Sequence, residues 1–246
     1  MAIKAITIDF WNTLYNSANG QARARDRAVV IRRELARLGV MAADQQLEQA
    51  QARAWEHFNR VWLQEQRTLL TADLVKFYLK QLHVIGDDQA LQAICDTFAD
   101  GILRHPPEPL GGAQHVIGGL AQMYPLGLIS DTAFSPGRVL KQVMAQHGLA
   151  QHFHCYSFSD ETGVSKPHPQ AFHTALQAMN IAPAECVHIG DIEHTDIKGA
   201  KELGMRAILF RGDSNSMVDQ GDERSTRADA IARDWHEVRT ILDGMR

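Results

Sequence analysis

The chain has 246 residues, which is longer than an average domain and allows either one large α/β unit or a core that carries a smaller inserted domain. Hydrophobic residues make up 45% and charged residues 22%, an ordinary globular composition that excludes a largely disordered chain. The formal net charge of -4 argues against nucleic acid and anionic membranes as partners. Since no apolar run approaches the roughly 20 residues of a membrane span and the start does not resemble a signal peptide, we expect a cytoplasmic protein.

The first predicted element is a strand that ends on a carboxylate. Residues 3–8 (IKAITI) form a short β-branched run, and Asp9 follows it directly. Residues 20–104 then repeat apolar side chains at helical spacing and contain no convincing strand. This periodicity predicts an inserted helical domain, whose aromatic side chains, such as Trp55, Phe58 and Trp62, are expected to build its core. HPPEPLGG at 105–112 is expected to be the hinge where the chain returns to the sheet.

Strands and helices alternate after this hinge. Apolar runs predict strands at residues 125–130, 185–191 and 206–210. Turn and cap residues predict helices at 135–148, 169–180 and 195–204, and residues 228–242 predict a closing strand or turn and a peripheral helix. The alternation indicates an α/β fold, in which a parallel sheet is covered by helices on both faces.

Polar side chains end three of the predicted strands, namely Asp9, Ser130 and Asp191. In a parallel sheet the ligand binds outside the carboxyl ends of the strands. We therefore expect these three side chains to converge at one crevice.

Several other polar residues have less specific interpretations. Five arginines crowd the first inserted helix: Arg23, Arg25, Arg27, Arg32 and Arg33. They could receive an anionic substrate, but a solvated helix face is the favoured interpretation. The widely spaced Cys95, Cys155 and Cys186 fit small buried side chains better than a disulfide or a zinc site. His152 and His154 fit structural or surface roles better than metal ligation.

Four segments together resemble the haloacid dehalogenase-like (HAD) hydrolases: IDFWNTL at 8–14, LGLISDT at 126–132, SKPHP at 165–169 and HIGDIEHTDIKGA at 188–200. Each segment alone is weakly specific, but four in this order and spacing rarely coincide. The resemblance implies a Rossmann-like core at 1–16 and 105–246 with a helical cap at 17–104. This architecture agrees with the one that periodicity predicts.

The resemblance also implies a magnesium-dependent phosphohydrolase that acts on a small phosphorylated molecule. Asp9 matches the nucleophile that attacks phosphorus and forms an aspartyl phosphate. Magnesium prefers oxygen ligands, and Asp9, Asp191 and the backbone carbonyl of Trp11 match the protein ligands of the family. Asp196 is expected to hold the metal loop from the outer shell.

The same resemblance places four residues at the phosphoryl group. Ser130 matches the hydroxyl that binds a phosphoryl oxygen, and Thr13 matches a further substrate-binding residue. Lys166 matches the lysine that neutralises phosphoryl charge and holds the nucleophile. Asp131 stands where Asn is frequent, so its backbone amide can still bind substrate while its carboxylate is expected to disfavour some substrates.

Trp11 is the important departure from the family pattern. Phosphatases of the family usually have Asp two residues after the nucleophile, where it protonates the leaving group and later activates water. Trp11 can do neither, so the substrate has a good leaving group, another residue such as Glu193 or His194 acts, or the catalytic role is lost. An exposed loop is the favoured interpretation for Glu193 and His194.

Trp11 also keeps two rival functions open. The 2-haloacid dehalogenases of the family have an aromatic residue at this position, but they work without metal and usually lack the pair that Gly190 and Asp191 form here. A non-catalytic phosphate-binding or regulatory protein would keep the magnesium site and lack the proton-transfer group. The sequence makes no prediction of the substrate or of the oligomeric state.

Overall fold

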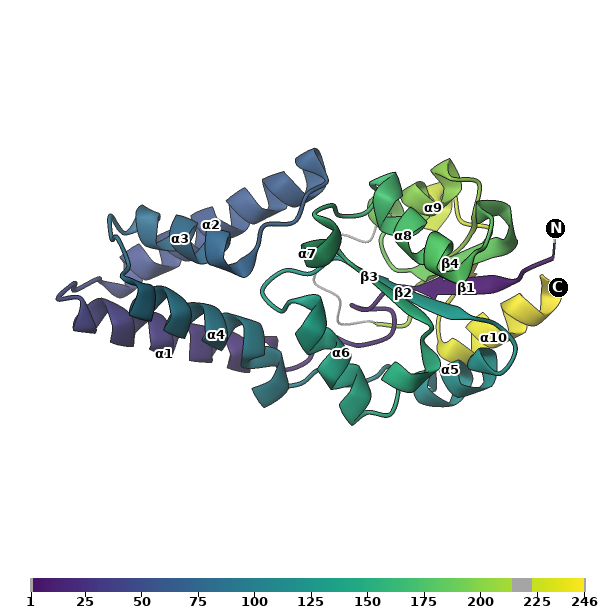
Figure 1. Cartoon of the computed structure of the whole chain (residues 1–246), viewed down its shortest axis with the longest axis horizontal. Coiled ribbons are helices and arrows are strands. Elements are labelled where there is room, and N and C mark those ends of the chain that lie inside the picture. The colour runs from purple at the N-terminus through teal and green to yellow at the C-terminus, as the bar shows by residue number, and fades with distance from the viewer. Residues whose placement is uncertain (1, 214–222, 246) are drawn as a thin grey trace.

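The computed structural model describes residues 2–213 and 223–245, so positions 1, 214–222 and 246 of the predicted core lie outside the described residues. A sheet covered by helices forms one part of the molecule, and an elongated helical unit projects from it on one side (Figure 1). Both chain ends lie at the side of the sheet that faces away from the helical unit. The α/β class predicted from the sequence is confirmed.

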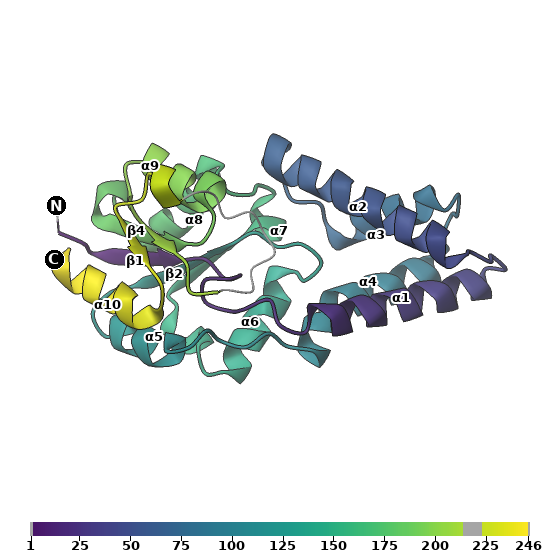
Figure 2. The same cartoon turned by 180° about the vertical axis from the view of Figure 1, so that it is seen from behind.

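Within the described residues the sheet has six strands, all parallel, in the order β3-β2-β1-β4-β5-β6. The strands are β1 (Ala5–Ile8), β2 (Leu126–Ser130), β3 (Cys155–Phe158), β4 (Cys186–Gly190), β5 (Arg206–Phe210) and β6 (Ala230–Ala232). β1 pairs with β2 on one side and β4 on the other, at the centre of the sheet (Figure 2). The residues that follow these three strands are therefore neighbours at one edge.

The helices cover both faces of the sheet. They are α1 (Gly20–Arg37), α2 (Asp44–Glu65), α3 (Thr71–Gln81), α4 (Asp88–Arg104), α5 (Ala113–Ala121), α6 (Gly137–Gln146), α7 (Ser159–Thr162), α8 (Pro169–Met179), α9 (Lys198–Glu202) and α10 (Trp235–Gly244). The shorter turns are η1 (Ala150–His152), η2 (Pro183–Glu185), η3 (Glu193–Ile197) and η4 (Glu223–Ser225). Ile6 and Ile8 of β1 pack in the cluster that includes residues of α5, α6 and α10, whereas Ala5 packs in the cluster that includes residues of α8 and α9.

Helices α1 to α5 lie between β1 and β2, which confirms the predicted insertion after the first strand. α1 pairs with α4 and α2 with α3, and the four share a separate hydrophobic cluster (Figure 1). α5 instead packs against α10 on the sheet. The segment from β1 to α1 and the segment from α4 to α5 connect the helical unit to the sheet and run side by side. Asn16 N donates to the carbonyl oxygen of Glu108 at 3.0 Å, and the Asn16 side chain accepts from Glu108 N.

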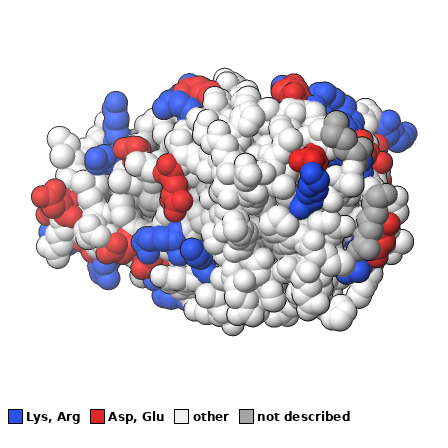
Figure 3. All heavy atoms as spheres, turned by 45° about the vertical axis from the view of Figure 1, so that its right-hand side comes forward, with Lys and Arg blue, Asp and Glu red and all other residues white. Residues whose placement is uncertain are grey.

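Several elements differ from the sequence prediction. Strand β3 and helices α5 and α7 were not predicted, and the helix expected at 195–204 begins two residues earlier as the π-helical turn η3, which runs into α9. Among the described residues, none of the helices combines the length and apolar character that crossing a membrane requires. On the face drawn in Figure 3, basic and acidic side chains are interspersed rather than gathered by sign.

Candidate active site

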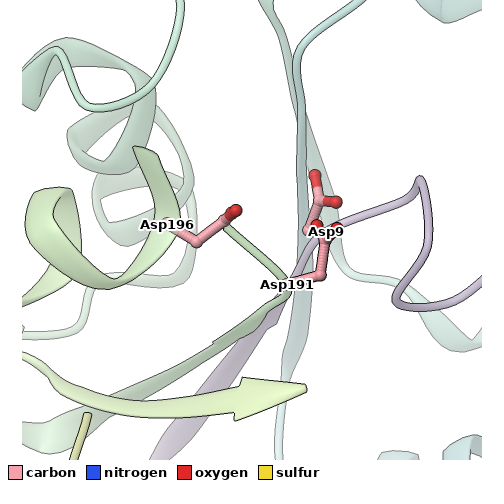
Figure 4. A group of neighbouring side chains, drawn as sticks. All are labelled: Asp9, Asp191 and Asp196. Atoms are coloured by element: carbon pink, nitrogen blue, oxygen red, sulfur yellow. The ribbon is translucent and has the colours of Figure 1, made fainter. Parts of the chain in front are cut away.

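Three buried carboxylates meet at the carboxyl ends of the central strands. Asp9 follows β1, Asp191 follows β4, and Asp196 lies in the π-helical turn η3. One oxygen from each lies within 4.8 Å of the others, and all three residues are at most 5% exposed. Figure 4 shows Asp9 and Asp191 beside each other, with Asp196 facing them from the neighbouring turn.

Asp196 is held by four hydrogen bonds that fill its carboxylate. It accepts from Lys166 Nζ at 2.7 Å and His188 Nε2 at 3.0 Å, and from Ile192 N and Thr195 Oγ1 at 3.2 Å each. Burial alone would raise the pKa of Asp196, but the charge of Lys166 and the bond from His188 hold it well below its usual range. Asp196 is therefore ionised and fixed in position.

Three residues of strands β1 and β4 fix the position of the Asp196 carboxylate. His188 Nδ1 lies 3.0 Å from Thr7 Oγ1, so a Thr7 hydroxyl that donates to Nδ1 leaves the proton on Nε2, which faces Asp196. Gly190 leaves room on the other side, because a Cβ there would lie 2.3 Å from the Cγ atom of Asp196. The glycine of the fourth motif is thus a packing requirement of the carboxylate.

Lys166 is the buried cation of the cluster. Its Nζ contacts Asp9 Oδ1 and Asp196 Oδ1 and lies 3.2 Å from the carbonyl oxygen of Ile129. Burial alone would lower the pKa of Lys166, but the nearby carboxylates of Asp196, Asp9 and Asp131 raise it above its usual value. The ammonium group is therefore charged at neutral pH.

The surroundings of Asp9 disfavour its ionised form in the protein without a metal. Burial raises the pKa of Asp9 well above its usual value, and the charges of Asp196 and Asp191 raise it further against the opposing effect of Lys166. A cation beside Asp9 and Asp191 would offset this penalty. Carboxylate and carbonyl oxygens suit a hard divalent ion, so the residues present fit magnesium.

The remaining predicted substrate-binding residues lie in different surroundings. Ser130 ends β2 and is 1% exposed, and Asp131 lines the cavity described below. Asp131 Oδ1 accepts from Lys166 N and Oδ2 accepts from Nε1 of Trp62 in α2, each at 2.9 Å. Burial raises the pKa of Asp131. Thr13 is fully buried outside the cavity lining, and its hydroxyl has no hydrogen-bond partner among the described residues.

A cavity of about 520 Å³ opens between this cluster and the helical insertion. Asp9, Asp191 and Lys166 lie at its floor, and its walls include the aromatic side chains of Trp11, Trp55, Phe58, Trp62 and Phe134. The expectation that the aromatic stripe only builds the helical core is therefore wrong in part: Phe58 is buried in that core, but Trp55 is 38% exposed.

Two of the arginines of α1 also line this cavity. Arg23 and Arg27 contribute to the wall, and Arg23 is only 9% exposed. The favoured interpretation of a solvated helix face is wrong for these two residues, while Arg25, Arg32 and Arg33 are exposed. The sequence could not separate the two groups, because which face of α1 lines the cavity depends on packing between the two parts of the molecule.

The residues considered as substitutes for the missing acid or base do not line the cavity. Glu193 accepts from Thr226 Oγ1 at 2.5 Å and from Arg227 N at 2.9 Å, and His194 is exposed. Trp11 lies in the cavity wall, packs edge-on against Phe10, and has the Arg23 guanidinium 5.9 Å from its ring centre. Where phosphatases of the family usually have the acid or base, this chain therefore has an aromatic side chain.

A ligand cavity at the carboxyl ends of central parallel strands, covered by a helical insertion after β1, defines a capped α/β protein. The family model for haloacid dehalogenase-like hydrolases matches residues 3–204, and the chain belongs to this family. The family predicted from the four motifs is confirmed, and the insertion is a cap of the type that follows the first strand.

Matches to individual curated proteins cover only about half of the chain. Over 122 residues the chain is 32% identical to the glyceraldehyde 3-phosphate phosphatase of Pyrococcus furiosus, a match that covers 49% of this chain and 48% of that protein. The chain spans about half the length of the curated relatives it matches.

Solved structures match over nearly the whole chain. The 2-haloacid dehalogenase of Pseudomonas syringae pv. Tomato DC3000 has a TM-score of 0.70 at 23% identity, with 99% of this chain and 100% of that chain covered. A HAD hydrolase of Bacillus subtilis bound to magnesium has a TM-score of 0.64 at 17% identity, with the same coverage. Such low identities establish a shared fold and do not distinguish between the two chemistries.

Proposed function

We propose that the chain is a magnesium-dependent phosphohydrolase that acts on a small phosphorylated molecule through an aspartyl phosphate on Asp9. The observation that supports this function best is the buried cluster of Asp9, Asp191 and Asp196 beside Lys166. These three carboxylates offer oxygens within 4.8 Å of one another, an arrangement that fits a divalent cation. The similarity to a glyceraldehyde 3-phosphate phosphatase is consistent with the proposal.

Each residue of the cluster has a proposed role. Asp9 attacks phosphorus, and Lys166 neutralises phosphoryl charge while it holds Asp9. The Ser130 hydroxyl and the backbone amide of Asp131 bind phosphoryl oxygens. Asp9, Asp191 and the carbonyl of Trp11 would hold magnesium, which offsets negative charge where the phosphoryl group binds. Asp196 orients Lys166 by accepting a hydrogen bond from its ammonium group.

The helical cap, for which we propose the bounds 17–104, closes the cavity over these groups. Trp62 brings the indole of α2 to Asp131, so the cap contacts the loop that binds the phosphoryl group. Exclusion of water by such a cover favours transfer to Asp9 over unproductive side reactions.

A screen with purified protein tests the proposal. Phosphomonoesters, acyl phosphates and 2-chloro acids are each incubated with magnesium or with a chelator. We expect phosphate release from esters or acyl phosphates only when magnesium is present, and no chloride release in either buffer. Chloride release in the chelator would establish the dehalogenase, which the aromatic side chain of Trp11 keeps as the second candidate.

Replacement of Trp11 tests the missing acid or base. We expect Trp11→Asp to raise kcat for alkyl phosphates by about 10- to 100-fold, less than the full contribution of a tuned proton donor. Trp11→Phe is the matched control and leaves kcat unchanged, because it retains an aromatic wall without a proton donor. Equal rates in the wild type and Trp11→Asp would contradict this account of the departure. Absence of magnesium-dependent turnover in all three proteins, with phosphate binding retained, would favour a non-catalytic phosphate-binding protein.

A further inference from the structure

Arg23 and Arg27 form a pair of cations on one face of α1. They are four residues apart, so their side chains lie one above the other along the helix. Both line the cavity whose floor contains Asp9. Arg25, between them in sequence, is exposed and does not line it. The helix therefore presents two guanidinium groups to the same space as the carboxylate cluster.

Neither guanidinium is paired with a carboxylate among the described residues. Arg23 Nη1 donates to the carbonyl oxygen of His105 at 2.7 Å. The guanidinium of Arg27 lies over the ring of Phe134, 4.6 Å from its centre. The adjacent carboxylate of Asp26 instead accepts from Arg104 and His105. Most of the ten N–H groups of the two arginines are therefore free to bind a ligand.

The surroundings of the pair make an anion favourable there. Burial lowers the pKa of Arg23, and burial together with the charge of Arg23 lowers the pKa of Arg27 to about 10. Both groups stay protonated at neutral pH, so two like charges share a poorly solvated wall. An anion that accepts hydrogen bonds from both would replace lost hydration and offset their repulsion.

The lining of the cavity thus includes two charged regions of different sign together with aromatic side chains. The phosphoryl site at Asp9 and Lys166 is one region, and the arginine pair is the other. Trp55 and Trp62 of α2 provide apolar surface in the same cavity. A volume of about 520 Å³ accommodates a ligand larger than a phosphate ion and its metal.

We infer that Arg23 and Arg27 bind a second anionic group of the substrate, so that the molecule hydrolysed is a phosphate ester with a carboxylate or a further phosphate on its alcohol portion. The assignment of a substrate class rests on the phosphohydrolase function proposed above. Direct, bidentate hydrogen bonds from guanidinium groups suit both kinds of anion.

Three aryl phosphates that differ only at a remote group test this assignment: 4-(2-carboxyethyl)phenyl phosphate, its neutral carboxamide and the corresponding phosphonate. The two methylenes keep the leaving groups similar. We expect wild-type kcat/KM for the better anionic ester to exceed that of the amide by about 10- to 100-fold, as for hydrogen bonds to charged groups. The ratio of carboxylate to phosphonate identifies which anion the pair prefers.

Variants of the arginines locate the effect. Arg27→Met and Arg23→Met are each expected to lower the anion preference at least about fivefold while kcat/KM for the amide changes little, because the lost contact is remote from phosphorus. Arg27→Lys retains part of the preference, and Arg25→Met on the exposed face of the same helix retains all of it. Thermal unfolding of each variant confirms that it is folded.

The outcomes separate this assignment from the proposed function. Equal kcat/KM for the amide and both anionic esters in the wild type, or a preference unchanged in both methionine variants, would overturn the arginine subsite while the phosphohydrolase stands. If none of the three esters is hydrolysed, the same comparison is made from dissociation constants by calorimetry in magnesium. Tighter binding of an anionic ester that depends on Arg27 supports the subsite, and equal affinities overturn it.

Discussion

Asp9→Asn is expected to lower kcat for phosphate ester hydrolysis by at least about 10⁴-fold, as removal of a nucleophile does in other enzymes. Asn has nearly the shape of Asp but cannot form the acyl phosphate at a useful rate. The measurement is phosphate release under saturating substrate and magnesium. A variant that keeps more than about a hundredth of the wild-type kcat would contradict Asp9 as the nucleophile.

The same substitution is not expected to lower the stability of the protein without metal, as the loss of a structural side chain would. Because burial and the charges of Asp196 and Asp191 raise the pKa of Asp9, its ionised form is disfavoured in the folded protein without metal. Asp9→Asn should therefore have an unchanged or higher melting temperature in chelator, and it should lose most of the upward shift that magnesium gives the wild type. Asp229→Asn, at a surface pair with Lys201, is the matched control and keeps the magnesium shift.

Lys166→Met is expected to lower the free energy of unfolding by about 3–5 kcal/mol, because it leaves the carboxylates of Asp9 and Asp196 buried without their cation. Urea denaturation in magnesium-free buffer measures the loss. Lys201→Met removes a cation from the partly exposed pair with Asp229 and should cost less than about 1 kcal/mol.

A double variant separates the charge from the packing of Lys166. If repulsion among unpaired carboxylates causes the loss, Lys166→Met combined with Asp9→Asn should be more stable than Lys166→Met alone. Losses of equal size for Lys166→Met and Lys201→Met would mean that Lys166 does not balance the buried cluster. Hydrolysis by Lys166→Met should also fall, since Asp9 loses its positioning contact.

The sheet could be predicted where its strands are buried on both faces. Residues of β1, β2, β4 and β5 are almost all buried, so each is a mostly apolar run that stands out in the sequence. β3 lies at the edge of the sheet and mixes Cys155, Tyr156 and Ser157, which gives no such run. Its existence depends on pairing with β2, and that partner is not visible in a local pattern.

Some residues of the candidate site could also be predicted from local sequence, and others could not. Asp9 and Asp191 could be placed from the sequence, because their positions follow from the ends of adjacent strands. The hydrogen bond between Trp62 and Asp131 and the inward face of Arg23 and Arg27 depend on how the helical unit packs over the sheet. The six arginines of α1 carry no local signal that shows which two line the cavity. The support of Asp196 by His188 and Thr7 likewise joins neighbouring strands that are far apart in sequence.

The peptide that carries Lys166 is also tied to the helical unit. Ser165 N donates to the carbonyl oxygen of Gln66 at 2.9 Å, and the hydroxyls of Ser165 and Thr68 lie 2.6 Å apart. Any swing of α2 and α3 away from the sheet must break these bonds, which lie one residue before Lys166, whose ammonium group contacts Asp9. In the proposed mechanism, opening of the cavity would therefore loosen the segment that carries Lys166, and closure would restore its support.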